Sequence, residues 1–380
     1  MMNYDVIVIG GGIVGSAAAY HLASSGAHTL LLDRRDVGRA TDAGAGILSA
    51  ATGTRESDRF DFAIRAFDYY PGLIAHLNAE QDSDTGYAVC GKLIVAVSED
   101  EEEPYRHTRS LMFDRQRETG RPQADQLREV SAAETRELFP LLAPTLGAIY
   151  DTEGARVDGR RLHTALQKAA RGHGLTIEEA SVSELIQDGN RITGVSADAR
   201  HYTAKNVIIA GGAWSSQFGD QLGVRIPVDP QRGQIIHLGL PGVDTSDWAI
   251  VSAFRGHYMV PWGDSRVVVG ATRETGSGFE PRTTAAGVEE VLDEACRVAP
   301  ELEDAEILEI RVGLRPLARD GRPILGPVPG LDGLLLATGH GPSGLQLGPY
   351  SGKLVGDLAM GIDLETDIEP FSISRFSSTA

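Results

Sequence analysis

Three glycines near the start of the chain have the spacing of a phosphate-binding turn. Gly10, Gly12 and Gly15 form the pattern G-x-G-x-x-G directly after the apolar run at residues 4–9. In such a turn the first glycine permits a sharp bend, the second lets the backbone approach a pyrophosphate, and the third lets the next helix pack on the strand. Asp33 follows, where an acid accepts hydrogen bonds from a ribose and repels a 2′-phosphate. The pattern predicts a dinucleotide site, and by itself it leaves FAD and NAD both open.

A second glycine-rich stretch follows at residues 39–47, with small and polar side chains throughout. Backbone of this kind can lie against a flat ring system or a phosphate. An ordinary loop is the alternative interpretation.

The elements that must position these residues are indicated by the apolar pattern. Short, nearly continuous apolar runs are typical of strands buried on both faces, and they occur at residues 4–9, 28–32, 206–210 and 333–338. Between them, residues 225–272 alternate in the manner of an antiparallel sheet. Helices are predicted at 13–24, 55–80, 99–119, 162–171 and 285–300, and a closing helix is predicted from near residue 345 to about residue 360. Residues 175–186 are predicted to form short extended or helical segments, and residues 87–97 a further strand.

Buried strands at the beginning, middle and end of the chain indicate one discontinuous domain with a second domain inserted into it. The fold class is α/β, and α+β overall, with a Rossmann-like nucleotide-binding domain and an inserted, mainly antiparallel-sheet substrate domain. We place the nucleotide domain at 1–82, 140–222 and 310–380, and the substrate domain at 83–139 and 223–309.

Composition excludes several classes of partner. The chain has 35 basic and 53 acidic residues and a net charge of −18, which repels nucleic acids and anionic lipids. No uninterrupted apolar run is long enough to span a membrane. Cys90 and Cys296 are the only cysteines and lie in no ligand-like cluster, so we expect neither a disulfide framework nor a metal site, and a cytoplasmic location.

Longer segments resemble the D-amino-acid oxidase-type family of FAD-dependent oxidoreductases, in its glycine oxidase, sarcosine oxidase and D-amino-acid dehydrogenase branch. Besides the glycine turn and residues 40–47, the matching segments are VIIAGGAWS (207–215), RGQIIHL (232–238), YMVPWGDSRVVVGAT (258–272), GLRPLARDGRPILG (313–326) and ATGHGPSGLQLGP (337–349). They occur in family order over about nine-tenths of the chain. The resemblance implies a split FAD domain with a sheet-based substrate domain covering the flavin.

The resemblance also implies roles for individual residues. Arg315 matches the arginine that holds the substrate carboxylate, with a surface salt bridge as the alternative. Tyr258 matches a tyrosine that assists it, and a tyrosine that only packs in the sheet is the alternative. His340 is either a substrate contact or a structural histidine. The residues predicted to bind FAD are Gly10, Gly12, Ile13, Val14, Gly15, Asp33, Arg34, Ala40, Thr41, Gly44, Ala45, Gly46, Ile47, Val182, Ala210, Gly211, Trp214, Arg315, Gly339, His340, Gly341, Pro342, Ser343, Gly344 and Leu345.

Some positions depart from the family pattern. Gly313 stands where sarcosine oxidase-like relatives carry a cysteine bonded to the flavin, so we expect non-covalent FAD. No lysine stands at or near Val268, where those relatives place one for oxygen reactivity, and Trp262 replaces a frequent arginine.

The implied reaction is hydride transfer from the α-carbon of an amino acid to flavin N5, which gives an imine that hydrolyses to a 2-oxo acid. A D-amino acid, glycine, or an N-alkyl or cyclic amino acid would suit the carboxylate clamp. Alternatives are a flavin subunit of a hetero-oligomeric amino-acid or opine dehydrogenase and a non-catalytic FAD-binding assembly factor. An electron-accepting partner and self-association are both left open.

Overall fold

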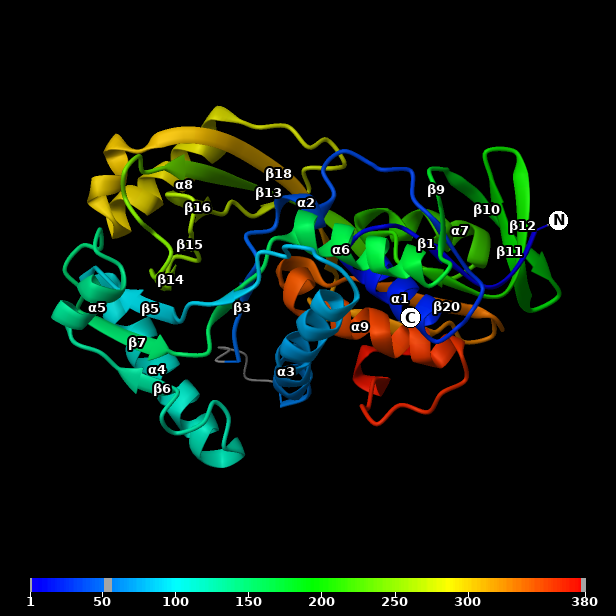
Figure 1. Cartoon of the computed structure of the whole chain (residues 1–380), viewed down its shortest axis with the longest axis horizontal. Coiled ribbons are helices and arrows are strands. Elements are labelled where there is room, and N and C mark those ends of the chain that lie inside the picture. The colour runs from blue at the N-terminus through cyan, green and yellow to red at the C-terminus, as the bar shows by residue number, and fades with distance from the viewer. Residues whose placement is uncertain (1, 51–56, 377–380) are drawn as a thin grey trace.

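The computed structural model describes residues 2–50 and 57–376 (Figure 1). Within these ranges the strands form sheets of eight, nine and three strands. Figure 1 shows the eight-stranded sheet and its helices at one end of the molecule and the nine-stranded sheet at the other. The predicted α/β class, with a Rossmann-like unit and a second, mainly antiparallel sheet, is confirmed.

The eight-stranded sheet has a parallel centre built from segments far apart in the chain. β1 (Met2–Ile9) pairs in parallel with β2 (Thr29–Leu32) and β12 (Arg200–Ile209), and β12 pairs in parallel with β20 (Leu334–Thr338). These strands contain the four predicted buried runs, which are buried because helices cover both faces of a parallel sheet. The remaining strands are β9 (Thr176–Glu178), β10 (Val182–Asp188), β11 (Arg191–Ala197) and β19 (Ile324–Pro327).

Helices with small residues pack tightly beside this sheet. α1 (Ile13–Ser24) carries the fully buried Ala17 and Ala18, and α9 (Gly344–Ala359) crosses it at Gly352. A Cβ atom at Gly352 would lie 2.5 Å from the carbonyl oxygen of Val14, so only glycine allows this approach. α3 (Ser57–Glu80) and α6 (Gly159–Gly172) pack on the same face of the sheet, and the short α7 (Gly219–Leu222) packs on the opposite face.

The nine-stranded sheet is antiparallel except where β5 runs parallel to β14. Its longest strands, β13 (Val228–Gly239) and β18 (Glu306–Ala318), pair along their whole length. The others are β5 (Lys92–Ala96), β6 (Leu127–Glu129), β7 (Gly147–Asp151), β14 (Ile250–Ala253), β15 (Tyr258–Trp262), β16 (Arg266–Gly270) and β17 (Glu274–Thr275). The accompanying helices are α4 (Glu102–Thr119), α5 (Ala132–Leu138) and α8 (Ala285–Val298).

Local predictions differ from the structure at the junction between the sheets. The strand predicted at 87–97 is two strands, β4 (Ala88–Val89) and β5, because Gly91 between them has a φ of 74°. Residues 40–47 contain α2 (Ala40–Ala43) and the start of β3 (Ile47–Leu48). β3 and β4 pair with β8 (Ala155–Arg156). Arg55, the predicted start of α3, lies outside the described residues.

Strand pairing also bears on the domain boundaries. β7 and β18 hydrogen-bond within the nine-stranded sheet, whereas the sequence predicts residues 140–222 and 310–380 to be part of the nucleotide domain. We therefore propose that β7 and β18 belong to the substrate domain, which leaves the rest of the predicted division unchanged.

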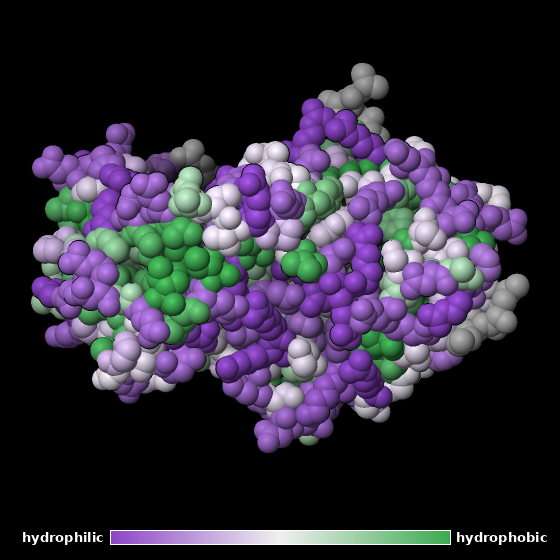
Figure 2. All heavy atoms as spheres, turned by 90° about the horizontal axis from the view of Figure 1, so that it is seen from above, coloured by the Kyte–Doolittle hydropathy of each residue, from purple (hydrophilic) through white to green (hydrophobic). Residues whose placement is uncertain are grey.

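The face of the molecule seen in Figure 2 is mostly hydrophilic, in keeping with the high net charge. Figure 2 shows apolar side chains gathered over the end that carries the nine-stranded sheet. In the same sheet Ile307 and Leu308 of β18 are about half exposed, at 49% and 50%. Among the described residues no helix has the length and apolarity to cross a bilayer, and both cysteines are free.

Candidate active site

A long cleft runs between the two large sheets and contains most of the residues predicted for the site. It opens at the carboxyl ends of β1, β2, β12 and β20, the edge where doubly wound sheets bind ligands. Its volume is about 1630 Å³, counting the open space at its mouth. The predicted residues that line it are Gly10, Gly12, Ile13, Val14, Asp33, Arg34, Ala40, Thr41, Gly44, Ala45, Gly46, Ile47, Val182, Ala210, Gly211, Trp214, Tyr258, Arg315, His340, Gly341, Pro342, Gly344 and Leu345.

Three predicted residues lie outside this lining. Gly15 packs behind the turn, where a Cβ atom would lie 1.9 Å from the carbonyl oxygen of Gly10. Gly339 faces Ala318, whose Cβ atom would be 3.0 Å from a Cβ at this position. Ser343 is exposed, and its N–H donates to the carbonyl oxygen of His340. These residues shape the two glycine turns without lining the cleft.

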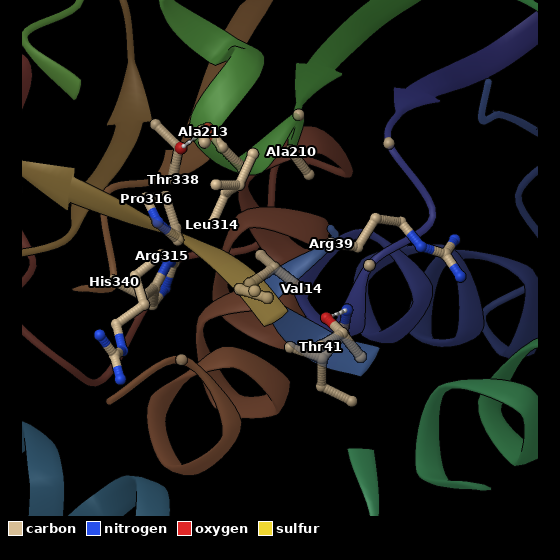
Figure 3. A pocket seen from close by; sticks show the side chains of 18 of the residues that line it. Val14, Arg39, Thr41, Ala210, Ala213, Leu314, Arg315, Pro316, Thr338 and His340 are labelled. Carbon is tan, nitrogen blue, oxygen red and sulfur yellow. Dashed lines mark hydrogen bonds between the residues drawn. The ribbon is translucent and has the colours of Figure 1, made fainter. Parts of the chain in front are cut away.

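The first glycine turn brings backbone to the floor of the cleft. Gly10 has a φ of 103°, a conformation that side chains rarely adopt, and a Cβ atom there would lie 2.5 Å from the carbonyl oxygen of Ala210. Thr41 accepts a hydrogen bond of 3.0 Å on its Oγ1 from the N–H of Ile13, which ties α2 to the first turn of α1 (Figure 3). The positive end of α1 thus points into the cleft.

Acidic and aromatic side chains mark one end of the cleft. Asp33, directly after β2, accepts a hydrogen bond of 2.8 Å from Nη1 of Arg39. Arg34 pairs with Asp36 at 2.5 Å, and its guanidinium lies 5.8 Å from the ring centre of Trp214. These groups suit a nucleoside, because a carboxylate can accept from ribose hydroxyls and the aromatic ring offers a flat apolar face.

A second glycine loop, residues 339–344, closes the opposite side. Thr338 at the end of β20 donates from its Oγ1 to the carbonyl oxygen of Gly212 at 2.9 Å and accepts from Ser215 at 3.0 Å. A single β-bridge joins Leu317 of β18 to His340. α9 begins at Gly344, so its positive N-terminal end faces the cleft, where it favours negative charge.

His340 is buried and neutral at the base of this loop. Its Nε2 lies 2.9 Å from the Oγ of Ser351, whose own hydroxyl donates to the carbonyl oxygen of Leu347. The Nε2 of His340 is therefore the donor, and the free electron pair is on Nδ1. Burial lowers the pKa of His340 to about 4. Its packing and hydrogen bond support a structural role, while its place in the lining keeps a contact with the bound ligand open.

We expect His340 to make the protein less stable as the pH falls below neutrality. The folded-state pKa is about 4 and the unfolded value is about 6.5, so the unfolded chain takes up the proton first between these pH values. The contribution of His340 to the free energy of unfolding should fall by about 3 kcal/mol across this window. Urea unfolding at pH 7, 6 and 5 measures it, with His340→Gln, which cannot be charged, as the comparison. If the free energy of unfolding changes equally with pH in the two proteins, the expectation is contradicted.

Arg315 and Tyr258 meet at the end of the cleft opposite Asp33. Arg315 comes from β18 and Tyr258 from β15, and the two share a side-chain hydrogen bond. Nη1 of Arg315 also donates to the carbonyl oxygen of Thr272 at 2.9 Å. Burial raises the pKa of Tyr258, which keeps its phenol protonated, and lowers the pKa of Arg315, although a guanidinium keeps its charge in proteins. Figure 3 shows Arg315 and His340 on one side of the cavity and Arg39 on the other.

The lining also includes residues that the sequence did not single out. Arg273, in the segment between β16 and β17, is a second cation at the Arg315 end. Gln346 lines the cleft and holds residue 49 through its side chain, accepting from the N–H of Ser49 at 3.2 Å and donating to its carbonyl oxygen at 3.1 Å. Arg273 directly follows the family-matching segment 258–272, and this position is the only feature of the sequence that points to it.

The arrangement fits FAD. Asp33 and the glycine turn at Gly10 would hold the nucleoside and pyrophosphate, and the loop at 339–344 would border the ring system. Gly313 lines the cleft and has no side chain that could form a bond to a flavin, and neither cysteine is among the described lining residues. The described residues contain no cluster of three or more His, Cys, Asp or Glu side chains that could hold a metal ion.

Known proteins are similar to this chain over its whole length. Residues 5–358 match the family model described as "FAD dependent oxidoreductase". The chain is 36% identical over 96% of its length to an uncharacterized oxidoreductase, YurR, of Bacillus subtilis (strain 168), covering 97% of that protein. It is 30% identical over 98% of its length to a glycine oxidase of Geobacillus kaustophilus (strain HTA426), covering 97% of it. The crystal structure of iminodiacetate oxidase from Chelativorans sp. BNC1 is 41% identical, with a TM-score of 0.92 over 97% of this chain and 98% of that one.

Proposed function

The chain belongs to the family of FAD dependent oxidoreductases, and from this premise we propose that it oxidises glycine or a glycine that carries a substituent on its nitrogen. The coarser activity, FAD-dependent oxidation of an amino-acid carbon–nitrogen bond, is supported by relatives named glycine oxidase and iminodiacetate oxidase. Both named substrates contain a CH2 group between a nitrogen and a carboxylate. We therefore propose a substrate that contains this unit, which both named substrates share.

The observation that carries the proposal is the Arg315–Tyr258 pair at the end of the cleft. A guanidinium is planar and can donate two parallel hydrogen bonds to one carboxylate. The protonated phenol of Tyr258 supplies a further donor beside it. A carboxylate bound there would fix the α-carbon of an amino acid at one position in the cleft.

The other described side chains that line the Arg315 end of the cleft include no carboxylate and no amine that could accept a proton from the substrate. Asp33 and Asp36 are the acidic residues of the described lining, and both lie at the nucleoside end. Positioning of the substrate is then the main contribution of the protein to the rate. Bound FAD supplies the acceptor for the hydride that leaves the α-carbon. The imine left behind takes up water and separates into a 2-oxo acid and an amine.

An anaerobic assay of the FAD-loaded enzyme tests the proposal. The enzyme is mixed with glycine, sarcosine, iminodiacetate, proline or D-alanine, and loss of flavin absorbance near its visible maximum is followed. We expect glycine or an N-substituted glycine to reduce the flavin fastest and glyoxylate to be released. Absence of reduction by any amino acid would overturn the proposal, and faster reduction by D-alanine or proline would overturn its substrate class.

A further inference from the structure

A second guanidinium lies beside the carboxylate clamp and is not needed to bind an ordinary amino acid. Arg273 lines the same cleft as Arg315 and Tyr258. It directly follows Thr272, whose carbonyl oxygen accepts the hydrogen bond from Arg315. The positive charges of both arginines act on the phenol of Tyr258, which places the three side chains in one electrostatic neighbourhood.

The carboxylate next to Arg273 in sequence does not neutralise it. Both oxygens of Glu274 are engaged elsewhere: Oε2 pairs with Arg232 at 2.5 Å, and Oε1 accepts from Gln234 at 2.7 Å and from Thr272 at 2.8 Å. Glu274 of β17 is thus paired with Arg232 of β13, and its charge also raises the pKa of Arg315. The end of the cleft keeps two positive charges.

Arg273 itself has no ion pair and no side-chain hydrogen bond within the part of the chain that the structure describes. Its guanidinium rests against the turn between β14 and β15, where a Cβ atom at Gly256 would lie 2.8 Å from Nη1. The residue is exposed at the mouth of the cleft, so a ligand can reach it. Burial is the largest cause that lowers the pKa of Arg315, and the neighbouring charge of Arg273 lowers this pKa further.

We propose that Arg273 binds a second carboxylate of the substrate, so that the preferred substrates are amino acids with two carboxylates. This inference rests on the proposed function, because Arg315 must hold the first carboxylate. An anion with two charges is held at both ends, whereas one with a single charge leaves Arg273 unpaired in the complex. Hydrogen bonds between charged groups are stronger than those between neutral groups. A ligand that lacks the second carboxylate therefore binds more weakly than one that carries it.

The test compares two substrates that differ only in the second carboxylate. Sarcosine and iminodiacetate are both secondary amines with one glycine unit, and iminodiacetate carries a carboxylate where sarcosine has a hydrogen. We expect the FAD-loaded enzyme to prefer iminodiacetate, and Arg273→Gln to lower kcat/KM for iminodiacetate by about 10- to 100-fold. kcat/KM for sarcosine should fall by a much smaller factor, because sarcosine has no second carboxylate for Arg273 to bind. Arg273→Lys keeps the charge and should recover part of the loss.

A matched control separates this role from a general effect of surface charge. Arg282 is exposed, lies a few residues further along the chain, pairs only with Glu280 among the described residues, and does not line the cleft. Arg282→Gln should leave both substrates unaffected. Equal losses for sarcosine and iminodiacetate in Arg273→Gln, or no loss for either, would overturn the role of Arg273.

Unreactive analogues keep the inference testable if no amine reduces the flavin. Glutarate and butyrate have the carbon skeletons of iminodiacetate and sarcosine, with a CH2 group in place of the amine. Their binding is measured by the change in the flavin spectrum of the FAD-loaded protein. Tighter binding of glutarate than of butyrate, lost in Arg273→Gln, supports the inference even if the proposed function fails. Equal binding of the two in the unaltered protein would overturn it.

Discussion

Replacing Arg315 with alanine is expected to lower kcat/KM for amino-acid substrates by about two to three orders of magnitude while FAD remains bound. The reason is that one partner of a desolvated, hydrogen-bonded charge pair is removed, which typically raises the free energy of the complex by about 2–5 kcal/mol. Most of the loss should appear in KM, because the carboxylate is charged before and during the reaction. Steady-state kinetics with the substrate identified in the panel, together with the flavin absorbance spectrum, measure both effects.

A second variant tests the position of Arg315 without removing its charge. A Cβ atom at Gly233 would lie 2.4 Å from Nη2 of Arg315, and the guanidinium is the flexible end of a long side chain. Gly233→Ala should therefore push Arg315 aside and lower kcat/KM in the same direction, by a smaller factor. Arg319→Ala, an exposed arginine four residues along the chain and outside the cleft, is the matched control. Full activity in Arg315→Ala or Gly233→Ala would remove the carboxylate clamp from the mechanism.

The parts of the fold that could be predicted are those in which a local pattern has one physical solution. A continuous apolar run such as residues 206–210 fits a strand covered on both faces, and β12 is such a strand. The glycine turn at Gly10 needs both a positive φ and close backbone contact, and the structure shows both. These features are read from a few neighbouring residues, so the sequence reports them directly.

Features that depend on contacts between distant segments could not be predicted in this way. Gly91 divides the predicted strand 87–97 because its two halves join different sheets, one at β8 and one at β7 and β14. Arg273 joins the site because β16, β17 and β18 are all neighbours of β13, which brings residues 273 and 315 to the lining of the same cleft. The domain boundary at β7 and β18 has the same origin. Pairing between strands that lie tens of residues or more apart in the sequence does not change the local hydrophobic pattern of either strand.

The glycine turn gives the other large expected effect: Gly10→Ala should abolish tight FAD binding and destabilise the protein. Alanine at a φ of 103° is strained by about 1–3 kcal/mol. Its Cβ atom would also lie 2.5 Å from the carbonyl oxygen of Ala210, a backbone atom that cannot move without shifting the end of β12. Because Gly10 and Ala210 both line the cleft, that shift would distort the floor on which the pyrophosphate is expected to lie. We expect the variant to be purified without colour and to bind added FAD at least about 100-fold more weakly, the equivalent of about 2.7 kcal/mol.

Gly26→Ala separates backbone strain from loss of the cofactor site. Gly26 also has a positive φ, 81°, but a Cβ atom there would have no atom within 4 Å, and the residue follows α1 at the end away from the cleft. We expect it to lower the free energy of unfolding by only about 1 kcal/mol and to leave FAD affinity unchanged. Urea unfolding of both apoproteins and FAD titration followed by flavin fluorescence measure the two quantities. If Gly10→Ala binds FAD as tightly as Gly26→Ala does, the close approach at Ala210 does not shape the cofactor site, and the assignment of the pyrophosphate to this turn is wrong.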